Sequence, residues 1–163
     1  MKKIILSAFM LIGLTFAAQA QDISKNALGL RLGGNYDIAS EVSYQRRMSD
    51  LNRLELGLGW NNNSNVDAFK LTGIYQWVWN IEGNFNWYAG VGGGLGSWSN
   101  TNKTNGTFIF ASSDVGIEYN FDIPLQFSLD IRPELGILGD YKYTNSNLNA
   151  LGLNIALGIR YRL

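Results

Sequence analysis

The sequence predicts an all-β protein, and more specifically an eight-stranded antiparallel up-and-down transmembrane β-barrel. Three observations lead to this prediction. Eight segments alternate between apolar and polar residues, as strands do because successive side chains point to opposite faces. Short and long connectors alternate between these segments, which is typical of barrels that cross a membrane. The apolar face also continues through all eight segments, as contact with lipid requires.

The first 20 residues are expected to be a signal peptide that is cleaved during export. Lys2 and Lys3 precede an apolar stretch, residues 4–16, that is short for a membrane span. The sequence Ala18-Gln19-Ala20 then matches a cleavage site for signal peptidase. We therefore expect one barrel domain over residues 21–163, with a mature N-terminus at Gln21.

The first four predicted strands cover residues 27–36, 41–48, 53–61 and 68–79. Their apolar faces consist of Leu28, Leu30 and Leu32, then Val42 and Tyr44, then Leu54, Leu56, Leu58 and Trp60, then Phe69, Leu71, Tyr75, Trp77 and Trp79. The residues between them are polar or small. An apolar residue at every second position favours a strand, because a helix would spread these residues around its axis.

The last four predicted strands cover residues 87–97, 107–121, 125–137 and 151–163. Their apolar faces consist of Trp87, Ala89, Val91 and Leu95, then Ile109, Val115, Ile117, Tyr119 and Phe121, then Leu125, Phe127, Leu129, Ile131, Leu135 and Ile137, then every odd residue from Leu151 to Leu163. The even positions of the last segment end in Arg160 and Arg162.

The connectors place the two ends of the predicted barrel. Residues 49–52, 80–86 and 122–124 are short turns, which we assign to the periplasmic side. Residues 61–67, 97–107 and 138–147 are rich in Asn, Ser and Thr, and we expect them to be extracellular loops. The first connector, "DIAS", is short where the alternation requires a long one. Trp98, Tyr141 and Tyr143 in the loops make an extracellular protein or glycan a candidate partner.

A soluble exported sandwich or barrel is the main alternative, because it would show the same alternation with its apolar face inward. Three features favour the membrane. Few polar residues interrupt the apolar faces, and the polar faces combine many glycines with few lysines. Aromatic residues also gather near the strand ends, as interfacial girdles do. They are Trp77, Trp79, Trp87, Tyr119, Phe121 and Tyr161 on the turn side, and Trp60 and Phe69 on the loop side.

With this pattern, the whole mature chain resembles the small eight-stranded outer-membrane barrels of the OmpX and OmpA-transmembrane type, often described as porin-family proteins. In that family the last strand ends in an aromatic residue, usually Phe, after alternating apolar residues. The segment is similar to the signal that the barrel-assembly machinery reads during biogenesis. Tyr161 fits this assembly signal, whereas Leu163 stands at the terminal position. The resemblance implies an outer-membrane location in a Gram-negative bacterium.

The composition argues against several function classes. The chain has no histidine, which the lipid A deacylase, palmitoyltransferase and omptin types of barrel enzyme need, and no cysteine for a nucleophile or a zinc site. We therefore expect no enzyme, no metal and no cofactor. After residue 20 there are 11 basic and 13 acidic residues, a net charge of −2, which gives no electrostatic reason to expect nucleic-acid binding.

The charged residues on the polar faces are expected to form a network inside the barrel. The predicted polar network consists of Arg31, Glu55, Lys70, Gln76, Glu118, Asp130, Arg132, Glu134, Arg160 and Arg162. Arg47 and Asp114 share this face, while Glu41 and Arg53 are expected nearer water. Arg132 is flanked by Asp130 and Glu134, which we expect to be its partners. Paired charges favour a plug, because a lone buried charge is costly.

Two further features belong to this prediction. Gly90, Gly92, Gly94 and Gly96 point inward and are expected to leave room for arginines from across the lumen. Arg46 is the one charge on a predicted lipid face, and its position beside a turn lets it reach the headgroups.

The sequence favours a structural or interaction barrel with a plugged polar lumen and exposed loops, in adhesion or in envelope integrity. The alternative is a narrow porin-like channel or a barrel that transports a small solute. An enzyme that acts on lipid or peptide is disfavoured by the missing histidine. The expected partners are outer-membrane lipid and, during biogenesis, the barrel-assembly machinery.

Overall fold

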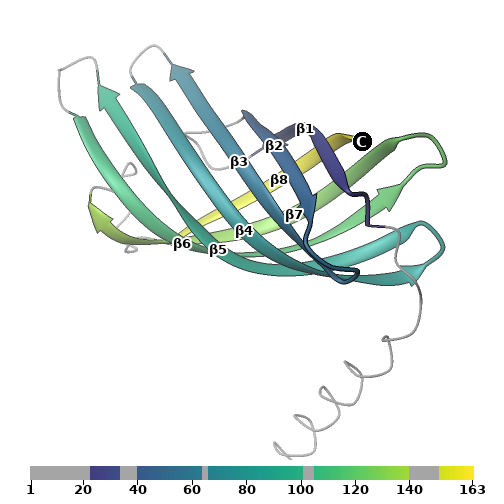
Figure 1. Ribbon diagram of the computed structural model, residues 1–163. Coiled ribbons are helices and arrows are strands. Elements are labelled where there is room, and N and C mark those ends of the chain that lie inside the picture. Colours follow the sequence, from purple (N-terminus) through teal and green to yellow (C-terminus); the bar gives the residue numbers. More distant parts are fainter. Residues whose placement is uncertain (1–22, 34–39, 64–65, 101–104, 140–150) are drawn as a thin grey trace, which may run out of the picture.

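A computed structural model describes residues 23–33, 40–63, 66–100, 105–139 and 151–163 (Figure 1). The predicted signal peptide, Tyr141 and Tyr143 lie outside the described residues. The strands are β1 (Asn26–Gly33), β2 (Ser40–Arg47), β3 (Asn52–Asn63), β4 (Val66–Glu82), β5 (Phe85–Asn100), β6 (Asn105–Asn120), β7 (Leu125–Gly139) and β8 (Leu151–Arg162). Within these ranges, no helix is long and apolar enough to cross a membrane.

The eight strands close into a single antiparallel barrel, which confirms the predicted fold class. Each strand pairs with the next along the chain, and β1 closes the barrel by pairing with β8 from Ala27↔Arg162 to Gly33↔Ala156. Closure leaves no free sheet edge among the described strands, as a lipid environment requires.

The hairpins at the loop end are longer than the sequence predicts. Residues 61–67 and 97–107 were expected to be loops, but β3 extends to Asn63 and β5 extends to Asn100. The ladder continues from Trp60↔Phe69 through the polar residues to Asn63↔Val66. The prediction was wrong because backbone pairing continues regardless of the weak strand preference of Asn and Ser.

The barrel wall is uneven in height. Strands β1 and β2 have 8 residues each, whereas β4 has 17 residues and β5 and β6 have 16 each. In Figure 1 the β3–β4 and β5–β6 hairpins rise well beyond the end of β1. One wall of the barrel therefore extends further at the loop end than the other.

The turn end is tight and rich in aromatic rings. In the β4–β5 turn, Gly83 adopts a left-handed conformation with a φ of 52°, which favours glycine. Trp79 and Trp87 stack with their ring centroids 4.4 Å apart on the outer surface of the same hairpin. Phe85, Tyr119 and Phe121 continue this row of rings around β5 and β6. This aromatic girdle marks one membrane interface.

Candidate functional site: the lumen

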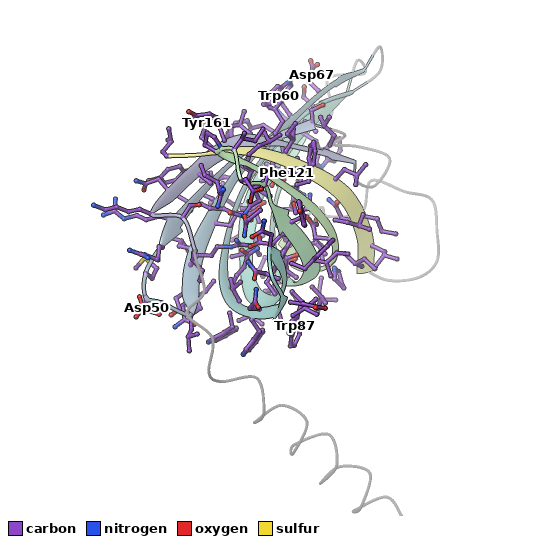
Figure 2. The ribbon with its side chains drawn as sticks, turned by 90° about the vertical axis from the view of Figure 1, so that its right-hand side faces the viewer. Asp50, Trp60, Asp67, Trp87, Phe121 and Tyr161 are labelled. Atoms are coloured by element: carbon purple, nitrogen blue, oxygen red, sulfur yellow. The ribbon has the colours of Figure 1, made fainter. Side chains whose placement is uncertain are left out.

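Charged and polar side chains point into the barrel, where they are buried (Figure 2). In the described part of the chain, five cations and six carboxylates are buried: Arg31, Arg53, Lys70, Arg132, Arg160, Glu41, Glu55, Asp114, Glu118, Asp130 and Glu134. On the outer face, Ile131 and Ile155 pair across β7 and β8 and are 44% and 50% exposed. The charges therefore face the lumen, and the large aliphatic side chains face outward.

The structure places nine of the ten predicted network residues in this interior. Arg31, Glu55, Lys70, Gln76, Glu118, Asp130, Arg132, Glu134 and Arg160 are each at most 5% exposed. Arg162 differs, because it is only half-buried and its Nη2 donates to the carbonyl oxygens of Phe121 and Ile123 in the β6–β7 turn. Arg47 is exposed at the end of β2. Both arginines occupy inward-facing positions of their strands, as predicted, since they pair with the buried residues Ala27 and Arg53. They lie at the turn-end rim and outside the buried network, which corrects the prediction.

Arg132 on β7 joins three other strands at the centre of the lumen. Its Nη1 lies 3.3 Å from Glu41 Oε1, and its Nη2 lies 3.1 Å from Glu55 Oε1 and 3.1 Å from Asp114 Oδ2. The expected partners of Arg132, Asp130 and Glu134, bind other cations. Side chains two residues apart on a strand point the same way, so each reaches a different partner across the lumen.

The partners of Asp130 and Glu134 come from opposite sides of the barrel. Arg31 on β1 forms a bidentate contact with Asp130, with Nε 3.0 and 3.1 Å from the two carboxylate oxygens, and its Nη2 also donates to Asn154 Oδ1 at 3.1 Å. Lys70 on β4 lies 2.7 Å from Glu134 Oε1. These two pairs tie β7 to β1 and to β4.

Glu41 and Arg53 are buried and not near water, which corrects the sequence prediction. They are 2% and 1% exposed. Arg53 Nη1 lies 2.7 Å from Glu118 Oε2, and its guanidinium lies 4.8 Å from the ring centroid of Tyr88. Arg53 lies near the start of β3, where Asn52 pairs with Trp77 of β4. Strand β4 continues well beyond Trp77, to Glu82. The β4–β5 hairpin therefore covers Arg53.

Glu55 accepts the largest set of donors described in the network. Its Oε1 accepts from Arg132 at 3.1 Å and Arg160 at 3.2 Å, while its Oε2 accepts from Gln45 at 2.7 Å and Gln76 at 3.2 Å. The donors come from four different strands, β2, β4, β7 and β8. A carboxylate held this way is structural, because its lone pairs are occupied by fixed donors.

Gly94 and Gly96 on β5 face aromatic rings and not arginines, so the sequence prediction was wrong for these two glycines. A Cβ at Gly90 or Gly92 would instead meet residues 73–76 of β4. Gly94 pairs with Phe110 and Gly96 pairs with Phe108. A Cβ on Gly94 would lie 2.7 Å from the Phe110 ring, and one on Gly96 would overlap the Phe108 ring. The rings fold over the glycines because no Cβ stands in their way. Phe108 and Phe110 were missed, although their register opposite glycines is a known aromatic pattern.

Apolar side chains form a small buried cluster at the turn end of the lumen. Ile23, which precedes β1, forms a buried cluster with Val78 and Tyr88, and all three are at most 4% exposed. Tyr88 also lies beside Arg53, so this cluster borders the ion network directly. Sequence reasoning missed Ile23 because it lies outside every alternating segment.

A groove lies at the loop end, between the tall ends of β4, β5 and β6. It encloses about 710 Å³ and is lined by residues that include Asp67, Ser97, Trp98, Asn105 and Thr107. Trp98 is half-buried, and its strand neighbours Ala68 and Gly106 are small. The lining combines an aromatic side chain with hydroxyl, amide and carboxylate groups.

The predicted assembly signal lies on the outside of the barrel. Tyr161 and Leu163 are 55% and 65% exposed, and Tyr161 pairs with Leu28 of β1 and Leu125 of β7. Within the described residues, no group of three or more Asp or Glu side chains is placed to hold a metal ion.

Comparison with known proteins shows the same fold. No family model and no curated protein matches the sequence. The N-terminal β-barrel domain of Pseudomonas aeruginosa OprF matches with a TM-score of 0.61 and 12% identity, over 85% of this chain and 98% of that chain. Neisserial surface protein A matches with a TM-score of 0.60 and 12% identity, over 85% and 94%.

The attachment invasion locus protein Ail of Yersinia pestis is a third similar structure. It matches with a TM-score of 0.54 and 12% identity, over 86% of this chain and 97% of that chain. At this level of identity the likeness shows the fold alone, which is that of small transmembrane β-barrels.

Proposed function

We propose that the chain is an outer-membrane barrel of a Gram-negative bacterium that has a closed lumen and acts as a structural or interaction protein. The observation that carries this proposal is the buried ion network. The network lies between two apolar groups, Ile23 with Val78 and Tyr88 at the turn end and Phe110 with Phe108 toward the loop end, which supports a closed lumen. An eight-stranded barrel is only wide enough for such side chains, so no continuous water path is expected.

Conductance in planar bilayers tests the closed lumen. We expect the purified protein to show no stable openings of porin size. Long-lived openings of uniform size in the unmodified protein would contradict the closed lumen and favour a narrow channel or transport barrel. The variant Ile23→Ser is a useful comparison, because it weakens the turn-end cluster while the ion pairs remain and should still leave the barrel closed.

Export and assembly form a second part of the proposal. The predicted signal peptide supports a mature chain that begins at Gln21, which N-terminal sequencing of membrane-extracted protein tests. A start at Met1 would contradict it. Exposure of Tyr161 and Leu163 on the last strand supports their role as an assembly signal. Tyr161→Ala should lower the yield of folded barrel in cells and leave refolding into lipid vesicles nearly unchanged.

The loop-end groove supports an interaction role. Trp98 and the surrounding Ser, Thr, Asn and Asp groups suit a sugar ring, because a sugar presents an apolar face for stacking and hydroxyls for hydrogen bonds. Ail, whose name refers to attachment and invasion, has the same fold. Binding to an array of glycans and host proteins tests this role. Trp98→Ala should remove the binding, and Trp60→Ala, a change on the lipid-facing surface, should not.

A further inference from the structure

Three exposed cations gather where β1 and β2 meet at the turn end. They are Lys25, Arg46 and Arg47. The backbone N–H of Arg47 donates to the carbonyl of Lys25 at 3.0 Å, and Arg46 pairs with Asn26 in the next ladder position. No ion pair joins these cations to a carboxylate in the described ranges. The exposed Asp50 lies in the following turn, at the edge of the barrel (Figure 2).

Arg46 lies on the outer face of the barrel. The alternate residues Glu41, Ser43 and Gln45 are buried, so Arg46 shares its face with Val42 and Tyr44. Its ladder neighbour on β3 is Leu54, which belongs to the apolar face. A guanidinium on this surface needs an anionic or polar partner at the membrane interface, because the lumen carboxylates lie on the other side of the sheet.

A neighbouring amide adds a directed hydrogen-bond donor. Tyr44 Oη donates to Asn26 Oδ1 at 2.8 Å, and both side chains are half-buried. This bond occupies the amide oxygen and directs the amide N–H groups elsewhere. Because Asn26 pairs with Arg46, the amide and the guanidinium share one ladder position on the outer face. The corner therefore offers a guanidinium and an amide together, with two further cations at its edge.

The opposite part of the same rim has a different chemistry. There the surface carries the stacked rings of Trp79 and Trp87, and the exposed side chains Glu82 and Asp122. The cations are therefore concentrated on one corner and are not spread evenly around the barrel. This uneven distribution directs the attraction for an anionic headgroup to one corner of the rim.

We infer that this corner, formed by Lys25, Asn26, Arg46 and Arg47, binds the phosphate of an anionic phospholipid in the periplasmic leaflet. The guanidinium of Arg46 and the amide of Asn26 contact the phosphate from the lipid-facing side, and Lys25 and Arg47 supply charge at the rim. The inference rests on the membrane location proposed above and is independent of whether the lumen is closed.

Native mass spectrometry of the detergent-extracted protein tests the inference. The protein is presented with equal amounts of phosphatidylglycerol and phosphatidylethanolamine, and the lipid that remains bound is measured. We expect a clear preference for phosphatidylglycerol. The triple variant Lys25→Gln, Arg46→Gln and Arg47→Gln should lose this preference, with affinity falling about fivefold for each cation removed.

Three further variants separate the contribution of the positive charges from that of the Asn26 amide. The combined changes Lys25→Arg, Arg46→Lys and Arg47→Lys keep all three positive charges and should keep much of the binding. Asn26→Leu changes no charge and should weaken the binding, while Glu82→Gln on the opposite rim should leave it unchanged. Far-ultraviolet circular dichroism and heat-modified mobility in gels confirm that each variant is folded.

Three results would overturn the inference. The first is equal retention of the two lipids by the unmodified protein. The second is an unchanged preference in the triple variant that carries glutamine at the three positions. The third is displacement of the bound lipid by glycerol phosphate at a concentration similar to that of the lipid. That result would show that the corner recognises a soluble phosphate.

Discussion

Lys70 and Glu134 form an ion pair across the lumen, with Nζ 2.7 Å from Oε1, although 64 residues separate them in the chain. Both side chains are almost fully buried. The pair connects β4 to β7, which are not neighbours in the barrel. The sequence does not predict this pair, because Arg132 is the cation nearest to Glu134 along the chain. Only the three-dimensional arrangement shows that Glu134 binds Lys70.

Removal of one member of this pair should be more harmful than removal of both. Lys70→Met leaves the buried Glu134 carboxylate without its cation, which should cost about 3–5 kcal/mol in the free energy of unfolding. The double change Lys70→Met with Glu134→Met should recover much of that loss. Urea unfolding in lipid vesicles measures Lys70→Met, Glu134→Met and the double variant. Simple additivity of the two single losses would contradict direct coupling.

Two buried carboxylates should respond differently to neutralisation. Glu55→Gln removes the negative charge that Arg132 and Arg160 share, and it replaces one acceptor oxygen with an NH2 donor among fixed donors. Asp114→Asn removes one negative charge from a lumen that holds six carboxylates and five cations, and Arg132 keeps Glu41 and Glu55. We expect a loss of about 3 kcal/mol for Glu55→Gln and about 1 kcal/mol for Asp114→Asn. Equal losses in urea unfolding would show that charge balance does not matter here.

The lipid-facing surface gives a third prediction. Ile155→Arg and Ile131→Arg each place a cation in the apolar band and should cost about 2–4 kcal/mol. Ser99→Arg is the control, because Ser99 is exposed near the loop-end tip of β5 and should tolerate the change within about 1 kcal/mol. Unfolding in vesicles again gives the comparison. A harmless Ile155→Arg would mean that this face does not contact lipid.

The glycines of β5 give a fourth prediction. Gly96→Ala puts a Cβ into the Phe108 ring and 2.7 Å from the carbonyl oxygen of Phe69, so the ring must move. Such overpacking should cost about 1–3 kcal/mol. Gly73→Ala is the matched control, since its nearest contact is Leu56 at an ordinary 3.7 Å. Gly73→Ala should be close to neutral, and a comparable loss in both variants would argue against the aromatic filling of the glycine row.

Much of the fold could be predicted from the sequence because the strand period of two is strong. The odd residues of 151–163 are apolar, and those described from Leu153 to Leu163 are exposed, while Asn154 and Arg160 are buried. A membrane barrel places its apolar residues outside. The periodicity therefore predicts both that the segment is a strand and which of its faces contacts lipid. The strand ends were less predictable, as the polar residues of the β3–β4 hairpin show, because backbone pairing does not depend on hydrophobicity.

The pairing of charges could not be predicted in the same way. Periodicity shows that Asp130 and Arg132 share a face, but it does not show which residue lies opposite each one. That depends on the shear and tilt of the closed barrel, which bring Arg31 to Asp130 and Glu41 to Arg132. The same geometry buries Arg53 beneath the β4–β5 hairpin. Local sequence neighbours were therefore a poor guide to ionic partners.

The long-range character of the lumen contacts has a kinetic consequence. Arg31 and Asp130 are 99 residues apart, Glu41 and Arg132 are 91 apart, and Ser43 and Arg160 are 117 apart. These contacts join the first two strands to the last two, so they form only once β1 meets β8. An open intermediate would hold charges without partners, which places the main barrier at ring closure. Once closed, the same contacts must break together, so the native barrel should unfold slowly even where its equilibrium stability is modest.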